Sequence, residues 1–142
     1  MTSDVKNISS LPPLTLVLGG ARSGKSAYAE RLVEGAGGGT YLATAEALDQ
    51  EMQDRVKDHK ERRGKMWLTV EEPLDLADAL KKSAINNGLP VLVDCLTLWL
   101  SNIMAASRDV ETEIETLIST LSGCRAPVIM VSNEVGLGIV QD

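Results

Sequence analysis

The feature that most constrains this chain is the octapeptide Gly19-Gly20-Ala21-Arg22-Ser23-Gly24-Lys25-Ser26, which fits the pattern GxxxxGK[ST]. A short apolar run, 14–18, precedes it, and a stretch of helix formers, 25–34, follows it. A strand, a glycine-rich turn and a helix in this order are typical of a phosphate-binding loop, the P-loop. Glycines let backbone N–H groups converge on phosphate oxygens, and the helix start adds a favourable dipole. The alternative is a glycine-rich turn without a ligand.

Two side chains of this loop are expected to contact a nucleotide and its metal ion. Lys25 would reach the β- and γ-phosphates, and the Ser26 hydroxyl would bind Mg²⁺. Asp94 directly follows the apolar run Val91-Leu92-Val93. An acid at the end of a buried strand near the loop can hold the same magnesium ion, directly or through water. The alternative for Asp94 is an acid that starts a turn.

Strand-like and helix-like segments alternate along the rest of the chain, which predicts an α/β, P-loop NTPase-like fold: a mainly parallel sheet with flanking helices. Apolar residues make up 44 % of the 142 residues but aromatic residues only 3 %, so the core must be aliphatic. The glycine cluster 35–39 is interpreted as a flexible connector and not a second phosphate loop, because a strand follows it. The expected strands are 14–18, 40–44, 67–70, 91–93 and 128–132. The expected helices are 25–34, 46–63, one starting at Pro73, 96–104 as helix or turn, and one capped by Asp109.

The net charge of the chain and the length of its apolar segments limit its possible binding partners and cellular location. A net charge of −6 argues against a nucleic-acid binder, but not against a nucleotide, which needs only local donors. The apolar runs fall far short of the ~20 residues that span a membrane, and the N-terminus does not resemble a secretory signal. Cys95 and Cys124 are expected to be reduced thiols, so the cytoplasm is the default location. Residues 1–13 are expected to be a disordered leader and 14–142 one domain.

His59 is the only histidine of the chain, and it lies on the expected helix 46–63. Helical spacing places it within an apolar stripe and beside several cations. The stripe consists of Leu48, Met52 and Val56, and the cations are Arg55, Arg62 and Arg63. One interpretation is a helix C-terminus whose cations suit the dipole. The other is a nucleophilic histidine at an anion site, where arginines hold a phosphate chain and favour neutral imidazole.

The sequence resembles the bifunctional adenosylcobinamide kinase / adenosylcobinamide-phosphate guanylyltransferase family of cobalamin biosynthesis. The resemblance covers nearly everything after residue 13, and its matching segments keep the family's order. The most specific of them are LDQEMQDRVKDHKERRGKMWLTVEEP (48–73) and VSNEVGLGIV (131–140), whereas GGARSGKS indicates only a phosphate loop. The other matching segments are GGARSGKSAYAE (19–30), YLATAE (41–46) and VLVDCLTLWLSN (91–102).

The resemblance implies two reactions and a set of site residues. Family members phosphorylate adenosylcobinamide with ATP or GTP, and then transfer GMP from GTP through a guanylylated histidine, which maps onto His59. Catalysis would also use Lys25, with Mg²⁺ held by Ser26 and Asp94. The implied nucleotide contacts are Gly19 to Ser26, Ala43, Thr44, Ala45, Lys60, Glu61, Arg62, Arg63, Glu71 and Asp94. A carboxylate at the position of Glu71 can accept from guanine N–H groups or ribose hydroxyls, the alternative being a solvated acid. A homo-oligomer, a trimer by resemblance, is also implied.

The chain departs from the family pattern at its end, because members continue for several tens of residues past the segment 131–140. The apolar loop that contains Val135, Leu137, Ile139 and Val140 is expected to need a covering segment. We therefore expect a fragment, without the family's last helix and strand, that exposes an apolar patch. Two other functions stay open: a simple P-loop kinase of a small alcohol, which needs no histidine, and a GTP-binding remnant without turnover.

Overall fold

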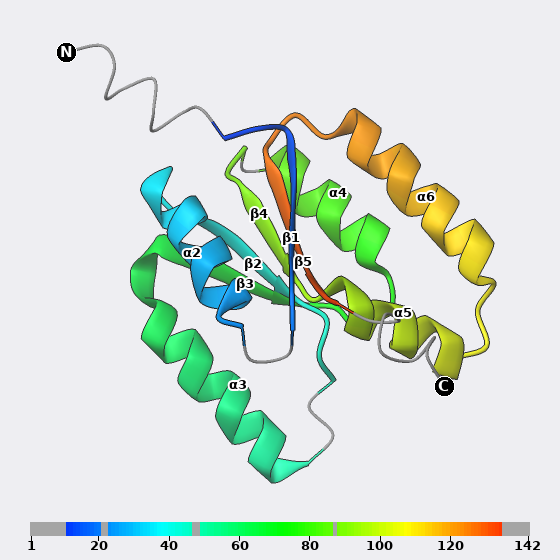
Figure 1. The fold of residues 1–142 in the computed structure, drawn as a ribbon, viewed down its shortest axis with the longest axis horizontal. Helices are drawn as coiled ribbons and strands as arrows, with labels where there is room; N and C mark the ends of the chain where they lie inside the picture. The colour runs from blue at the N-terminus through cyan, green and yellow to red at the C-terminus, as the bar shows by residue number, and fades with distance from the viewer. Residues whose placement is uncertain (1–10, 21–22, 47–48, 87, 135–142) are drawn as a thin grey trace.

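The computed structural model describes residues 11–20, 23–46, 49–86 and 88–134. Its strands form one parallel sheet in the order β1-β5-β4-β2-β3 (Figure 1). The strands are β1 (Leu14–Gly19), β2 (Gly39–Ala43), β3 (Trp67–Glu71), β4 (Val91–Asp94) and β5 (Val128–Asn133). The prediction of an α/β fold with a parallel sheet is therefore confirmed. The predictions for residues 1–10 and for the loop 135–142 lie outside the described residues.

Helices cover the two faces of the sheet. They are α2 (Lys25–Gly35), α3 (Gln50–Arg63), a 3₁₀ turn η1 (Gly64–Met66), α4 (Leu76–Asn86), α5 (Leu96–Ala105) and α6 (Val110–Gly123). The helices α4, α5 and α6 bury one face of β2, β4 and β5 in a cluster that includes Leu42, Val93 and Trp99. On the other face, Ala29 and Val33 of α2 pack against the remaining side chains of the same strands. The core is mostly aliphatic, as the composition predicted.

Two predicted helix starts are wrong, and capping explains both. The helix that carries His59 begins at Gln50 and not at Glu46, because the Asp49 carboxylate accepts the Met52 N–H at 2.8 Å and caps it there. The next helix begins at Leu76 and not at Pro73. Before it, one Glu72 carboxylate oxygen accepts the N–H groups of residues 74 and 75 at 3.1 and 3.0 Å and fixes a turn.

The interpretation of 35–39 as a flexible connector is also wrong. Gly38 and Gly39 are buried, and Gly39 is the first residue of β2. A Cβ at Gly38 would collide with the Met66 carbonyl, and one at Gly39 with the Pro90 carbonyl. Gly38 also has a φ of 106°, which favours glycine. The cluster therefore allows close packing between the end of α2, β2 and the neighbouring loops.

One face of the edge strand β1 is buried, and its other face is exposed to solvent. Val17 packs against the α2 face, whereas Leu14, Leu16 and Leu18 are 51 %, 54 % and 60 % exposed. Alternation along the strand directs these three leucines toward the opposite face. Within the described residues, no helix has both the length and the apolar character needed to cross a membrane.

Candidate functional site

Several of the predicted site residues lie at the carboxyl edge of the sheet, where parallel α/β sheets bind ligands. Ala43, at the end of β2, pairs with Glu71 on one side and with Asp94 on the other. Gly19 ends β1 and leads into the phosphate loop. Strand register therefore brings together residues that are far apart in the sequence.

The described part of the phosphate loop is held by its own side chains. Ser23 Oγ and Lys25 Nζ both donate to the Gly20 carbonyl, at 3.0 and 2.8 Å. Gly24 precedes α2 with φ 80° and ψ 15°, a left-handed conformation that favours glycine. A Cβ at Gly19 would collide with Ser23 Oγ. Ala21 and Arg22 lie outside the described residues.

Asp94 is the acceptor on which the phosphate loop and β2 converge. Its Oδ2 accepts a hydrogen bond from Ser26 Oγ at 3.2 Å and another from the Tyr41 hydroxyl. Burial, and then the Asp94 carboxylate, raise the pKa of Tyr41 above its ordinary value, so the phenol is the donor. Sequence reasoning missed Tyr41, although it begins the quoted segment YLATAE.

His59 lies on α3 and lines two cavities. One of about 190 Å³ is shared with Asp94 and with Val56 of the predicted stripe, whereas Leu48 of that stripe lies outside the described residues. Its other lining residues are Tyr41, Ala43, Ala45, Arg63, Thr69, Cys95 and Leu98. The second cavity, of about 290 Å³, lies between α2 and α3 and is lined by Ala27, Glu30, Glu34, His59, Arg62 and Arg63. The histidine therefore faces the strand-end acid on one side and a mixed-charge cavity on the other.

Arg63 lines both cavities and connects α3 to the sheet. Its guanidinium carbon lies 3.6 Å from the centre of the Tyr41 ring, and its Nη2 donates to Thr69 Oγ1 at 3.3 Å. Its Nε is buried without a hydrogen-bond partner among the described residues. An arginine held in this way can present a fixed positive charge to a phosphate chain.

The remaining residues predicted to contact the nucleotide do not share one environment. Thr44 is fully buried, and its hydroxyl donates to the Cys95 carbonyl at 2.8 Å and accepts the Cys95 N–H at 2.9 Å. Lys60 and Glu71 line a third cavity of about 250 Å³, which shares Val56 with the cavity of His59 and Asp94 but is not lined by His59. Glu61 is exposed on α3.

Two carboxylates of α2 also escaped sequence reasoning. Glu30 follows Ser26 by four residues, so the two share a helix face, and that spacing was the available signal. Burial raises the pKa of Glu30 above its ordinary value, although Arg63 opposes this shift. Glu34 accepts from the Trp67 indole N–H at 3.0 Å.

The oxygen ligands at Asp94 suit a hard cation. Magnesium is usually held by one or two protein oxygens together with substrate phosphates and water. The hydroxyl of Ser26 and the carboxylate of Asp94 supply such a pair. Among the described residues there is no group of three or more His, Cys, Asp or Glu side chains that could hold a metal ion by themselves.

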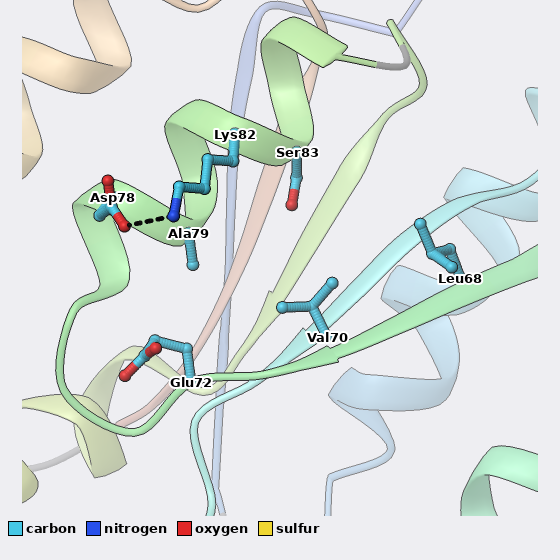
Figure 2. Close-up of a pocket in the computed structure, with 7 residues that line it drawn as sticks. All are labelled: Leu68, Val70, Glu72, Asp78, Ala79, Lys82 and Ser83. Atoms are coloured by element: carbon cyan, nitrogen blue, oxygen red, sulfur yellow. Dashed lines mark ion pairs between the residues drawn. The ribbon is translucent and has the colours of Figure 1, made fainter.

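A cavity of about 330 Å³ lies away from these residues, between β3 and α4. Figure 2 shows Leu68, Val70 and Ala79 around it, with the Asp78–Lys82 ion pair at its rim, 3.1 Å between Oδ2 and Nζ. No residue predicted to bind nucleotide lines this cavity. This cavity is therefore separate from the predicted nucleotide contacts.

Comparison with known proteins identifies the family of this chain. The family model described as "Cobinamide kinase / cobinamide phosphate guanyltransferase" matches residues 15–142. The chain belongs to this family. A bifunctional adenosylcobalamin biosynthesis protein, CobP, of Pseudomonas aeruginosa is 48 % identical over 128 residues, which cover 88 % of this chain and 73 % of that protein. The proteins of the same description named CobU are 37 % identical in Escherichia coli and 36 % in Salmonella typhimurium; each match covers 91 % of this chain and 79 % of the relative.

Proposed function

We propose that this chain phosphorylates adenosylcobinamide and then transfers GMP from GTP to the product, through a guanylylated His59. Membership of the cobinamide kinase / cobinamide phosphate guanyltransferase family supports both activities. The observation that carries the proposal is that His59 and Asp94 line one cavity at the carboxyl edge of the sheet. The nucleophile and the acid near the phosphate loop thus face the same space.

The nucleotide, ATP or GTP, would bind with its phosphates on the loop 19–26. Lys25 Nζ, which donates to Gly20 O in the structure, would turn to the β- and γ-phosphates. Ser26 and Asp94 would hold Mg²⁺, which would neutralise charge on the phosphate oxygens when bound. The proposed contacts to the rest of the nucleotide are Ala43, Thr44, Ala45, Lys60, Glu61, Arg62, Arg63 and Glu71.

The kinase step needs little covalent chemistry from the protein. The acceptor hydroxyl oxygen attacks the γ-phosphorus, the bond from that phosphorus to the bridging oxygen breaks, the nucleoside diphosphate leaves, and the hydroxyl proton passes to water. Positioning and charge stabilisation by Lys25 and the loop N–H groups account for most catalysis of this kind. This step therefore does not depend on a nucleophilic histidine.

The guanylyl step does depend on His59. An imidazole nitrogen attacks the α-phosphorus of GTP, an N–P bond forms, and pyrophosphate leaves. A phosphate oxygen of phosphorylated cobinamide then attacks the same phosphorus and breaks the N–P bond. Arg62 and Arg63, which line the cavity between α2 and α3 with His59, supply positive charge beside the transferred group. A homo-oligomeric state, trimeric by resemblance, and a cytoplasmic location stay predictions.

The test is incubation with GTP labelled at the α-phosphate, followed by a search for label on the protein. We expect a phosphoramidate that is labile in acid and stable in base, and that His59→Ala abolishes. Asp58→Ala, at an exposed neighbour on the same helix, is the matched control and should label normally. His59→Ala should still show the thermal shift that GTP and Mg²⁺ induce, whereas Lys25→Ala should lose it. Label that survives in His59→Ala would identify another nucleophile and overturn the proposal.

A further inference from the structure

Tyr41 is the residue that contacts both halves of the proposed site. It lies in the middle of β2, is only 7 % exposed, and meets the edge of the Trp67 ring at a centroid distance of 5.8 Å. Its hydroxyl donates to Asp94, and its ring lies under the guanidinium of Arg63. One side chain thus connects the magnesium-site acid to the helix that carries the histidine.

The hydroxyl contact constrains the orientation of the Asp94 carboxylate. Oδ2 accepts from both Ser26 and Tyr41, so the carboxylate is held from the loop side and from the strand side. Carboxylates that ligate metals are usually oriented by such hydrogen bonds, and loss of the partner typically lowers metal affinity about 10- to 100-fold. Tyr41 is in the position of such a partner.

The ring contact constrains Arg63. Arg63 follows His59 by four residues, so the two side chains share a helix face. No residue of α3 is buried, so contacts at its end have a large part in fixing its position. The guanidinium of Arg63 stacks on the Tyr41 ring and donates a hydrogen bond to the Thr69 hydroxyl.

We propose that Tyr41 is a positioning residue for both reactions: its hydroxyl orients Asp94 for magnesium, and its ring holds Arg63 beside His59. This inference rests on the proposed function. Tyr41 itself touches no reacting atom. The two contacts are separable, because phenylalanine keeps the ring and removes only the hydroxyl.

The hydroxyl is tested with Tyr41→Phe and a GTP analogue that cannot be hydrolysed. The Mg²⁺ concentration for half of the maximal thermal shift should rise about tenfold or more, while binding of the analogue in EDTA is unchanged. Tyr28→Phe, at the half-exposed tyrosine of α2, is the control and should leave the Mg²⁺ midpoint where it is. An unchanged midpoint in Tyr41→Phe would overturn this half of the proposal.

The ring is tested by labelling with α-labelled GTP at saturating Mg²⁺. Tyr41→Phe should then label at the wild-type rate, and Tyr41→Leu should label roughly three- to thirty-fold more slowly. Tyr41→Met, which keeps more side-chain volume, replaces Tyr41→Leu if that variant does not fold. In an Arg63→Gln background the difference between Phe and Leu at position 41 should shrink to less than about twofold, because the partner is gone.

The outcomes separate the two proposals. If wild-type protein acquires no label from GTP, the proposed guanylyl transfer fails, and the Mg²⁺ titration still tests the hydroxyl. If wild-type protein labels but the difference between Phe and Leu persists unchanged without Arg63, the ring does not act through Arg63. That result would overturn the second half of this inference and leave the proposed function intact.

Discussion

The helices α2 and α3 carry the two halves of the proposed site, and they are built in opposite ways. The helix α2 continues from the phosphate loop and buries Ala29 and Val33 completely against the sheet. The helix α3 is longer, lies at the periphery of the molecule, and buries none of its 14 residues (Figure 1). The phosphate half of the site is therefore part of the core, whereas the histidine half is attached to it.

The sequence explains this difference. Met52 and Val56 are the only apolar residues of α3, so the helix has little apolar surface to bury. Its stability must come from local contacts, which here include the Asp49 cap and the Arg55–Glu51 ion pair at 2.9 Å. Each such contact contributes about 1 kcal/mol or less. A polar helix can thus hold charged side chains toward a cavity, but contributes little to the stability of the domain.

The largest expected effect is a difference in stability between the core and α3. Trp99→Ala removes a side chain that is 1 % exposed and should lower the free energy of unfolding by about 3–5 kcal/mol. Met52→Ala on α3 should lower it by less than about 1 kcal/mol, because the site is only partly buried and alanine favours the helix. Urea denaturation measures both. Equal losses in the two variants would show that α3 is as firmly packed as the core.

A substitution in the turn that follows α3 should have a smaller effect on the free energy of unfolding. Gly64 has φ 77° and ψ −160°, a region that is essentially restricted to glycine, and a Cβ there would meet no atom within 4 Å. Gly64→Ala should therefore cost about 1–3 kcal/mol through backbone strain alone. Gly35→Ala, at the end of α2, needs no positive φ and should be neutral or slightly stabilising. Hydrogen exchange of the α3 amides should rise in Gly64→Ala, and an unchanged exchange pattern would contradict the link between this turn and the helix.

Much of the fold can be predicted from the sequence because the patterns that indicate its strands and helices are formed by residues that are adjacent in the chain. The apolar runs 14–18 and 91–93 each predict a strand from adjacent residues, and the structure contains both strands. The start of α3 was misplaced because the decisive contact is a cap, and Asp49 competes with other polar residues for that role. The glycines 38 and 39 were misread because the backbone groups they approach lie far away in the sequence.

The candidate site was predictable only in part. Motif and resemblance pointed to Asp94 and His59, and the structure places both at one cavity. Tyr41 was missed because in a strand pattern it is indistinguishable from a core residue until the hydroxyl's partner is known. Helical periodicity separates Lys60 from His59, since adjacent residues lie about 100° apart around a helix, but it does not specify that Lys60 shares a cavity with Glu71 of β3.

The smallest expected effect comes from Glu30, which lies at the border between the two helices. Burial raises its pKa above the ordinary 4.5, Glu34 and Asp94 add to the rise, and Arg63 and Arg62 oppose it. A raised pKa in the folded state means that the contribution of Glu30 to stability is complete below about pH 4.5 and is lost as the pH rises through the raised value. Relative to Glu30→Gln, the wild-type protein should therefore lose a little stability as the pH rises above about 4.5, as measured by urea midpoints.

The effect of Arg63→Gln on this pH dependence tests whether the end of α3 lies against α2 in solution. If the end of α3 stays against α2 in solution, Arg63→Gln removes a charge that favours ionised Glu30, and the loss of stability with rising pH should become larger. If α3 swings away, Arg63 is already distant and the substitution should leave the pH dependence unchanged. The difference in stability between the proteins with Glu and with Gln at position 30 is measured with Arg63 present and with Gln at position 63. Comparing these two differences cancels the direct effect of Arg63→Gln on stability. An unchanged difference would show that the cavity shared by His59 and Glu30 is not maintained without ligand.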